Sequence, residues 1–165
     1  MLIIHTEDAT ATFAFGRRLG ASLTAGDVVC LSGGLGAGKT LLAQGVAAGL
    51  AVEEEVTSPT FTVLQVYETG RLPIFHFDLY RLDSPDELLD IGFAEYANGD
   101  GVALVEWADK FAAEMPPAHL WLEIKMDGST GREIKLQPAG ERYRRLCEEL
   151  KDSADSGHGH RQPGV

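Results

Sequence analysis

A glycine-rich octapeptide between an apolar run and a helical pattern constrains this chain more than any other feature. Residues 28–31, Val-Val-Cys-Leu, form a continuous apolar run, as in a strand buried on both faces of a parallel sheet. GGLGAGKT, residues 33–40, follows and matches the pattern G-x-x-x-x-G-K-[ST] in full. LLAQGVAAGL then continues a helix predicted from about Thr40 to Leu50. A strand, a loop and a helix in this order predict an α/β fold whose loop binds phosphate groups.

The residue types of this phosphate loop, residues 33–40, suit that role. Glycines let the chain curl so that successive N–H groups point at one anion, and the start of the helix adds its positive dipole end. Lys39 would reach the β- and γ-phosphates, and the Thr40 hydroxyl would ligate Mg²⁺. The alternative is a chance glycine-rich turn, which the flanking strand and helix disfavour.

A second apolar strand, residues 102–105, ends in an acidic residue, Glu106. Phosphate-loop sites take an acidic residue, usually Asp, from such a strand end to hold Mg²⁺. The extra methylene of Glu would lengthen the reach, either directly to the cation or through a water. The alternative is an exposed carboxylate at a strand end, and the adjacent Trp107 is more typical of packing than of base stacking.

Two further segments carry polar groups. SPTFT, residues 58–62, follows the first helix, where a hydroxyl of Thr60 or Thr62 could sense the nucleotide; a proline-containing turn is an equal alternative. HFDLYR, residues 76–81, ends another apolar strand, and Asp78 could orient or deprotonate the attacking water. His76 lies on the same side of that strand and is more typical of a structural histidine.

The remaining patterns complete a single domain. Strands are predicted at 2–4, within 56–67, and at 73–79, 119–125 and 132–137, with helices at 8–24, from Ser84, and at 139–151. Together they predict a three-layer fold like that of phosphate-loop nucleotide hydrolases, with a mostly parallel central sheet plus antiparallel strands. We expect residues 1–151 to form one phosphate-loop domain and residues 152–165, which are polar and glycine-containing, to form a disordered tail.

The composition narrows the class of protein. With 165 residues and a net charge of −11, the chain suits one acidic domain that binds neither DNA nor RNA on its own. Any role on RNA would run through a partner protein. Two distant cysteines, Cys30 and Cys147, do not form a disulfide framework. We expect no signal peptide and no membrane span, and hence a cytoplasmic location.

Taken together, these segments resemble the TsaE family, formerly YjeE, the ATPase of bacterial tRNA threonylcarbamoyladenosine synthesis. The resemblance covers about residues 8 to 137. One departure is Gly34, where the family commonly has Asp. The matching pieces are GGLGAGKT at 33–40, SPTFT at 58–62, HFDLYRL at 76–82, SPDEL at 84–88 and VEW at 105–107.

The resemblance implies a set of site residues. Thr40 and Glu106 would hold Mg²⁺, and Asp78 and Lys39 would support hydrolysis. The residues implied to bind ATP or ADP are Ala9, Gly33, Gly36, Ala37, Gly38, Lys39, Thr40, Leu41, Asp109 and Arg132.

The resemblance also implies partners, TsaB and TsaD, which build the modification on adenosine 37 of tRNA. The ATPase would reset their complex between cycles. Only Arg81 and Arg132 are candidates for an arginine that stabilises the transition state, so we expect slow hydrolysis by the chain alone and faster hydrolysis with partners.

Two other functions stay open at this point. A small-molecule kinase would carry an arginine-rich lid, whereas the pair Arg144-Arg145 falls in the last predicted helix. A GTPase would carry the tetrapeptide Asn-Lys-x-Asp, which the sequence lacks. Apart from the resemblance, the sequence does not decide between ATP and GTP.

Overall fold

The structure is a computed structural model that describes residues 1–34, 36–59 and 61–161, with side chains described as far as residue 152. Its helices and strands follow the predicted α/β order. They are β1 (Leu2–Thr6), α1 (Ala9–Ser22), β2 (Val28–Ser32), α2 (Lys39–Gly49), β3 (Leu64–Tyr67), β4 (Ile74–Asp78), α3 (Pro85–Asp90), α4 (Phe93–Ala97), β5 (Val102–Glu106), the 3₁₀ helix η1 (Ala108–Glu114), β6 (His119–Asp127), β7 (Gly131–Ala139) and α5 (Glu141–Arg161).

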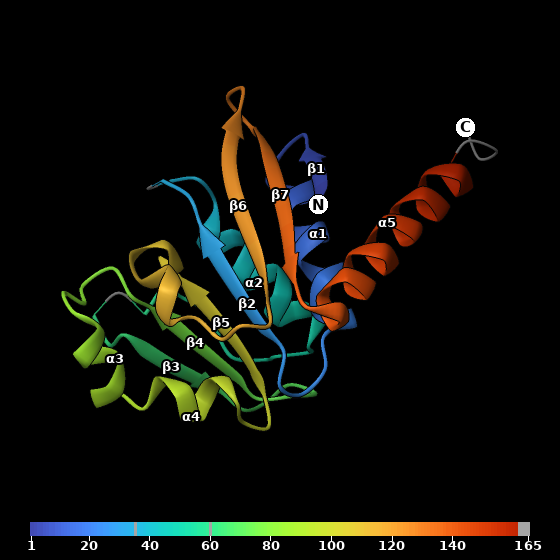
Figure 1. Ribbon diagram of the computed structural model, residues 1–165. Coiled ribbons are helices and arrows are strands. Elements are labelled where there is room, and N and C mark those ends of the chain that lie inside the picture. Colours follow the sequence, from blue (N-terminus) through green and yellow to red (C-terminus); the bar gives the residue numbers. More distant parts are fainter. Residues whose placement is uncertain (35, 60, 162–165) are drawn as a thin grey trace.

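One sheet of seven strands, in the order β1-β7-β6-β2-β5-β4-β3, runs through the molecule (Figure 1). The four central strands β6, β2, β5 and β4 pair in parallel, and the outer strands add antiparallel pairings. The predicted parallel centre with antiparallel additions is therefore confirmed. β2, which leads into the phosphate loop, is buried along its whole length, as its apolar sequence indicates.

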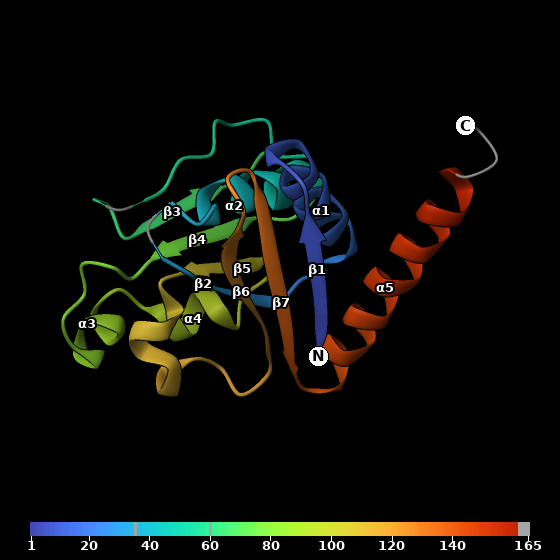
Figure 2. The same ribbon diagram turned by 90° about the horizontal axis from the view of Figure 1, so that it is seen from above.

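Helices cover both faces of the sheet and complete the three layers. α1 and α2 lie on one face, and α3, α4 and η1 lie on the other (Figure 2). Each face has its own apolar core: one includes Leu42 and Val46 of α2 with Leu31 of β2, and the other includes Phe77 of β4 and Phe93 of α4. The loop between β2 and α2 is thus anchored at both ends in one packed core.

α1 and α2 approach each other backbone to backbone. Gly16 and Gly20 of α1 face Gly45 and Gly49 of α2. A Cβ atom on Gly20 would lie 2.1 Å from the carbonyl oxygen of Val46, and one on Gly49 would lie 2.2 Å from the carbonyl oxygen of Arg17. Only hydrogen fits at these positions, so the two helices pack more closely than side chains would allow.

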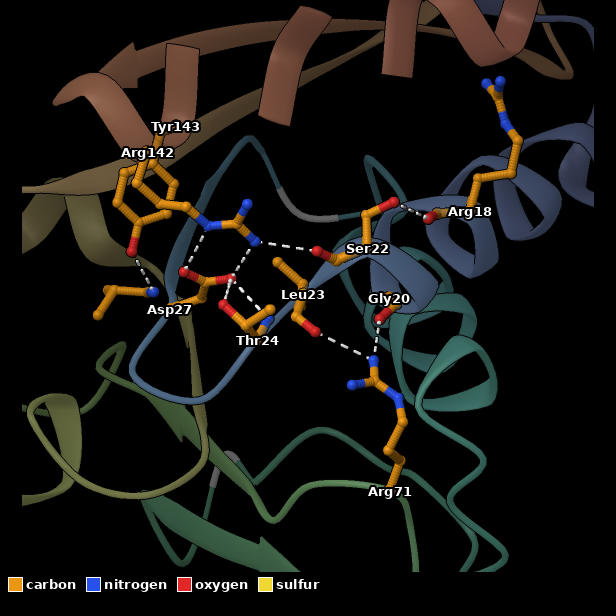
Figure 3. Close-up of polar contacts among 10 residues, drawn as sticks. Arg18, Gly20, Ser22, Leu23, Thr24, Asp27, Arg71, Arg142 and Tyr143 are labelled. Carbon is orange, nitrogen blue, oxygen red and sulfur yellow. Dashed lines mark hydrogen bonds and ion pairs between the residues drawn. The ribbon is translucent and has the colours of Figure 1, made fainter. Parts of the chain in front are cut away.

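A polar network ties the first turn of α5 to the turn before β2 (Figure 3). The Arg142 guanidinium donates two hydrogen bonds, of 3.1 and 2.8 Å, to the buried carboxylate of Asp27. Thr24 donates its N–H to the same carboxylate, and the Tyr143 hydroxyl accepts the N–H of Val28 at 2.8 Å. α5 is therefore fixed at its beginning, while its later turns project away from the sheet (Figure 1).

Several element boundaries differ from the sequence predictions. The helix that begins after Ser84 is interrupted at Gly92, whose φ of 71° is left-handed, so α3 and α4 are separate. η1 was not predicted. The predicted end of the last helix at residue 151 is wrong, because α5 continues to Arg161. The division into a domain of residues 1–151 and a disordered tail of 152–165 stays a prediction. Among the described residues, none of the helices has the length and apolar character that crossing a bilayer requires.

Candidate functional site

The phosphate loop adopts a curled backbone that depends on glycine. Gly36 and Gly38 have φ values of 76° and 108°, which are left-handed. Gly38 directly precedes α2 and offers no side chain to cap the helix. The first turn of α2 therefore presents its N–H groups to whatever lies in front of the loop, an arrangement that suits an anion.

A cleft of about 300 Å³ lies beside this loop. Its walls come from four segments: the loop with α2, the SPTFT segment, the end of β4, and the end of β5. The lining residues are Gly36, Gly38, Lys39, Thr40, Leu41, Ser58, Asp78, Tyr80, Glu106 and Trp107. The structure therefore brings the four segments that the sequence singled out to one place.

Strand alternation explains why two carboxylates meet at this cleft. Successive side chains of a strand point to opposite faces, so His76 and Asp78 share the α2 face of β4 with Ile74. Glu106 lies on the same face of β5, and β4 and β5 pair so that Asp78 is the partner of Glu106. Both carboxylates are only 2% exposed. The alternative of an exposed carboxylate at position 106 is therefore wrong.

Lys39 lies between the loop and the aromatic wall of the cleft. Its ammonium group donates hydrogen bonds to the carbonyl oxygens of Gly33 at 2.6 Å and Gly34 at 2.8 Å. It also lies 4.2 Å from the centre of the Trp107 ring. As expected, Trp107 packs against an apolar core, the one that includes Phe77 and Phe93. Trp107 also lines the cleft, where its ring lies beside the Lys39 ammonium.

The electrostatic surroundings of Lys39 are mixed. Burial lowers the pKa of its ammonium group, and the carboxylates of Glu106, Asp109 and Asp78 offset only part of that effect. A negatively charged ligand in front of the loop would therefore stabilise the charged form of Lys39.

Asp78 is held from two sides. The Ser58 hydroxyl donates to one carboxylate oxygen at 2.9 Å, and the Tyr80 N–H donates to the other at 3.0 Å. Ser58 was not among the site residues expected from the sequence, although it belongs to the SPTFT segment. Of the two hydroxyls suggested there, Thr62 is exposed in a turn, and Thr60 lies outside the described residues. The alternative of a proline-containing turn before a strand agrees with the start of β3 at Leu64.

Glu106 is paired with His76. The imidazole Nε2 and the carboxylate Oε2 are 2.6 Å apart, and both side chains are buried. The other ring nitrogen, Nδ1, is buried and has no hydrogen-bond partner among the described residues. His76 is therefore only half satisfied, which differs from the structural histidine that the sequence favoured.

The remaining expected site residues lie around the cleft at different distances from it. Arg132 donates a hydrogen bond of 2.7 Å from Nε to the carbonyl of Ala37, and so buttresses the phosphate loop from β7. Asp109 and Gly33 line a second cleft, and Trp107 lines both clefts. Ala9 is the exposed first residue of α1 and is not among the residues that line the first cleft.

The donors at this site fit a nucleotide with Mg²⁺. Mg²⁺ prefers oxygen ligands and commonly takes one or two from protein, with the rest from phosphates and water. Thr40 and Glu106 supply a hydroxyl and a carboxylate to the same cleft. No group of three or more His, Cys, Asp or Glu side chains suited to a metal occurs in the part of the chain that the structure describes.

Comparison with known proteins identifies the family. The family model described as "Threonylcarbamoyl adenosine biosynthesis protein TsaE" matches residues 6–134. The chain belongs to the TsaE family. A TsaE protein of Bacillus subtilis (strain 168) is 43% identical to it over 88% of this chain and 91% of that protein. One of Treponema pallidum (strain Nichols) is 42% identical over 79% and 96%, respectively. Both are named tRNA threonylcarbamoyladenosine biosynthesis proteins.

A solved structure agrees with the fold. The crystal structure of YdiB from Bacillus subtilis matches with a TM-score of 0.79 and 38% sequence identity, covering 93% of this chain and 95% of that one. The P-loop-type α/β fold that the sequence predicted is therefore confirmed.

Proposed function

We propose that this protein binds ATP with Mg²⁺, hydrolyses the ATP, and acts as the accessory ATPase of the threonylcarbamoyladenosine modification at position 37 of tRNA. The observation that carries the proposal is the meeting of Lys39, Asp78 and Glu106 at the N-terminus of α2. Membership of the TsaE family supports the assignment to tRNA modification.

The phosphate loop supplies binding. The N–H groups at the start of α2 would face the phosphates, with Arg132 fixing the loop through Ala37. The ammonium of Lys39, now on two carbonyls, would exchange these for phosphate oxygens. Thr40 and Glu106 would hold Mg²⁺, which supplies positive charge against the phosphates when bound.

Asp78 has the geometry of a group that acts on water. Its carboxylate accepts hydrogen bonds from Ser58 and from the Tyr80 backbone, which fix its orientation at the cleft wall. A carboxylate held in this way can orient the attacking water or accept its proton. Ser58 and Tyr80 would act through Asp78 by holding it in place.

The proposal includes protein partners, TsaB and TsaD. A chain with a net charge of −11 is a poor binder of tRNA on its own, so contact with tRNA would run through these partners in the cytoplasm. Hydrolysis by the chain alone would be slow, and docking would supply or order the missing transition-state groups.

The kinase alternative is less well supported. Arg144 and Arg145 lie on α5, as the sequence predicted, where both pair with Glu141 of the same helix. Neither arginine lines the cleft. Family membership likewise favours the accessory ATPase.

A pull-down from the native cytoplasm with tagged protein, with and without ATP, tests the proposal. We expect TsaB and TsaD to be recovered in a nucleotide-dependent way, and phosphate release to rise when both are added to the pure protein. Fast hydrolysis that partners leave unchanged would contradict the accessory role. ATP-dependent phosphorylation of a metabolite would favour the kinase.

A further inference from the structure

We propose that His76 is a positioning residue whose imidazole fixes the carboxylate of Glu106, so that one oxygen is held and the other is available to Mg²⁺. The inference rests on the proposed function, because it takes Glu106 as the carboxylate that holds the cation. It adds a role for a buried residue that lies behind the cleft and does not line it.

The pairing is built into the sheet. His76 of β4 and Glu106 of β5 lie on neighbouring parallel strands and share the face toward α2. The Nε2 to Oε2 distance is 2.6 Å, and the side chains are 0% and 2% exposed. A contact this short and this buried restrains the carboxylate far more than a solvent-exposed one would.

The geometry also assigns the proton. A carboxylate oxygen accepts, so Nε2 carries the hydrogen and donates it to Glu106. Nδ1 is buried and has no partner among the described residues. A hydrogen on Nδ1 would be a buried donor without an acceptor, which is costly. The geometry therefore places a hydrogen on Nε2, the nitrogen that faces Glu106.

The hydrogen bond from His76 restrains a side chain that is longer than the aspartate usual at this position. Phosphate-loop proteins usually use Asp at this strand end. Glu has one more rotatable bond, so its carboxylate samples more positions unless it is held. The imidazole donates a hydrogen bond to Oε2 of Glu106, which leaves Oε1 as the oxygen for the cation. A residue that hydrogen-bonds to a metal ligand commonly raises the metal affinity by about 10- to 100-fold.

The test compares three variants of the full chain. His76→Leu removes the donor. His76→Gln keeps an N–H donor near the position of Nε2. His119→Leu is the matched control, because His119 contacts the carbonyl of Pro116 at the start of β6 and is not among the residues that line the cleft.

ADP binding is measured by titration calorimetry in EDTA and over a range of Mg²⁺ concentrations. For His76→Leu we expect the Mg²⁺ concentration of half-maximal effect to rise about tenfold, with unchanged affinity in EDTA. His76→Gln and His119→Leu should stay within about threefold of the wild type. In a Glu106→Gln background, His76→Leu should add nothing, because it acts through Glu106.

A second measurement needs neither nucleotide nor metal. ¹⁵N NMR of the wild-type imidazole should show His76 with its hydrogen on Nε2. If His76→Leu does not fold, His76→Asn replaces it, since its amide is too short to reach Glu106.

Four results would overturn the inference: a hydrogen on Nδ1, an unchanged Mg²⁺ response in a folded variant, an equal loss in EDTA, or an added effect in the Glu106→Gln background. A wild-type protein that shows no Mg²⁺-dependent nucleotide binding would instead overturn the proposed function, and the inference with it.

Discussion

Lys39 is the residue on which nucleotide binding should depend most. Its ammonium is the cation that the phosphate loop brings to the cleft, and burial makes a negative partner favourable for it. We predict that Lys39→Ala weakens ATP binding by about 100-fold or more, since it removes charge-assisted hydrogen bonds to phosphate. Titration calorimetry measures the loss, and circular dichroism checks the fold. Lys151→Ala, at an exposed position on α5, is the control. Wild-type affinity in Lys39→Ala would refute the site.

Asp78 should matter for turnover more than for affinity. A group that acts on the attacking water stabilises the transition state, so Asp78→Asn should lower kcat by about 10²- to 10⁴-fold while ADP affinity stays close to that of the wild type. Ser58→Ala, which removes one donor to Asp78, should lower kcat less. Single-turnover hydrolysis with the partners present, together with ADP titration, measures both effects. A parallel loss of binding and hydrolysis would indicate that Asp78 is structural.

The residues of the site could be predicted only where a local motif carries them. Lys39 and Thr40 lie within one octapeptide, and Glu106 ends an apolar run, so order and spacing pointed to them. The hydrogen bond between His76 and Glu106 joins residues 30 apart, and it depends on the parallel register of β4 and β5. No local pattern encodes such a register, so this pair could not be predicted from the sequence.

At the scale of elements, the first turn of α5 attaches that helix to the rest of the domain through Arg142 and Asp27. Removing the Arg142 side chain leaves the buried Asp27 carboxylate with Thr24 as its remaining partner. We predict that Arg142→Ala lowers the free energy of unfolding by about 1–3 kcal/mol, less than for a fully buried pair because solvent screens the partly exposed guanidinium. Urea unfolding measures it. Arg144→Ala, on the exposed side of the same turn, should cost about 0–1 kcal/mol. Equal effects would mean that the bridge to Asp27 is not the cause.

The packing of α1 on α2 gives a second prediction at this scale. In Gly20→Ala the new methyl group would lie against the carbonyl of Val46, where neither backbone can yield. We expect a loss of about 1–3 kcal/mol in the free energy of unfolding, or more, through overpacking. Gly34→Ala is the control, because its Cβ would meet open space at an ordinary φ. Thermal unfolding of both variants measures the two losses. A Gly20→Ala variant as stable as the wild type would show that the helices can separate.

Element prediction succeeded where a pattern was long or sharply bounded. The first helix, predicted at 8–24, spans Ala9–Ser22 with Asp8 as its N-cap, and the helix start after Ser84 is confirmed. The break at Gly92 had a visible signal in the glycine itself, whereas η1 had none, because its single short turns carry no periodicity. The order of the strands in the sheet, with β1 beside β7, follows from tertiary packing and not from any local sequence.

At the scale of the whole molecule, Leu150 is the last residue of α5 in the apolar core among those whose side chains the structure describes. A chain truncated after Asp152 should therefore keep its free energy of unfolding within about 0.5 kcal/mol and keep its nucleotide affinity. Urea unfolding and ADP titration test the predicted domain boundary. A truncated chain that loses stability would assign the last turns of α5 a structural role, and one that loses only partner-stimulated hydrolysis would assign them to docking.

The glycine contact between α1 and α2 also bears on how the family can vary. Where two side chains make a contact, a substitution of one is compensated by a substitution of the other. The two positions then vary together among related sequences. Where backbone meets backbone, as at Gly20 and Gly49, no compensating substitution exists. We expect these positions to stay glycine in lineages that keep the phosphate loop. This close contact between helices would then be invisible to methods that infer proximity from paired substitutions.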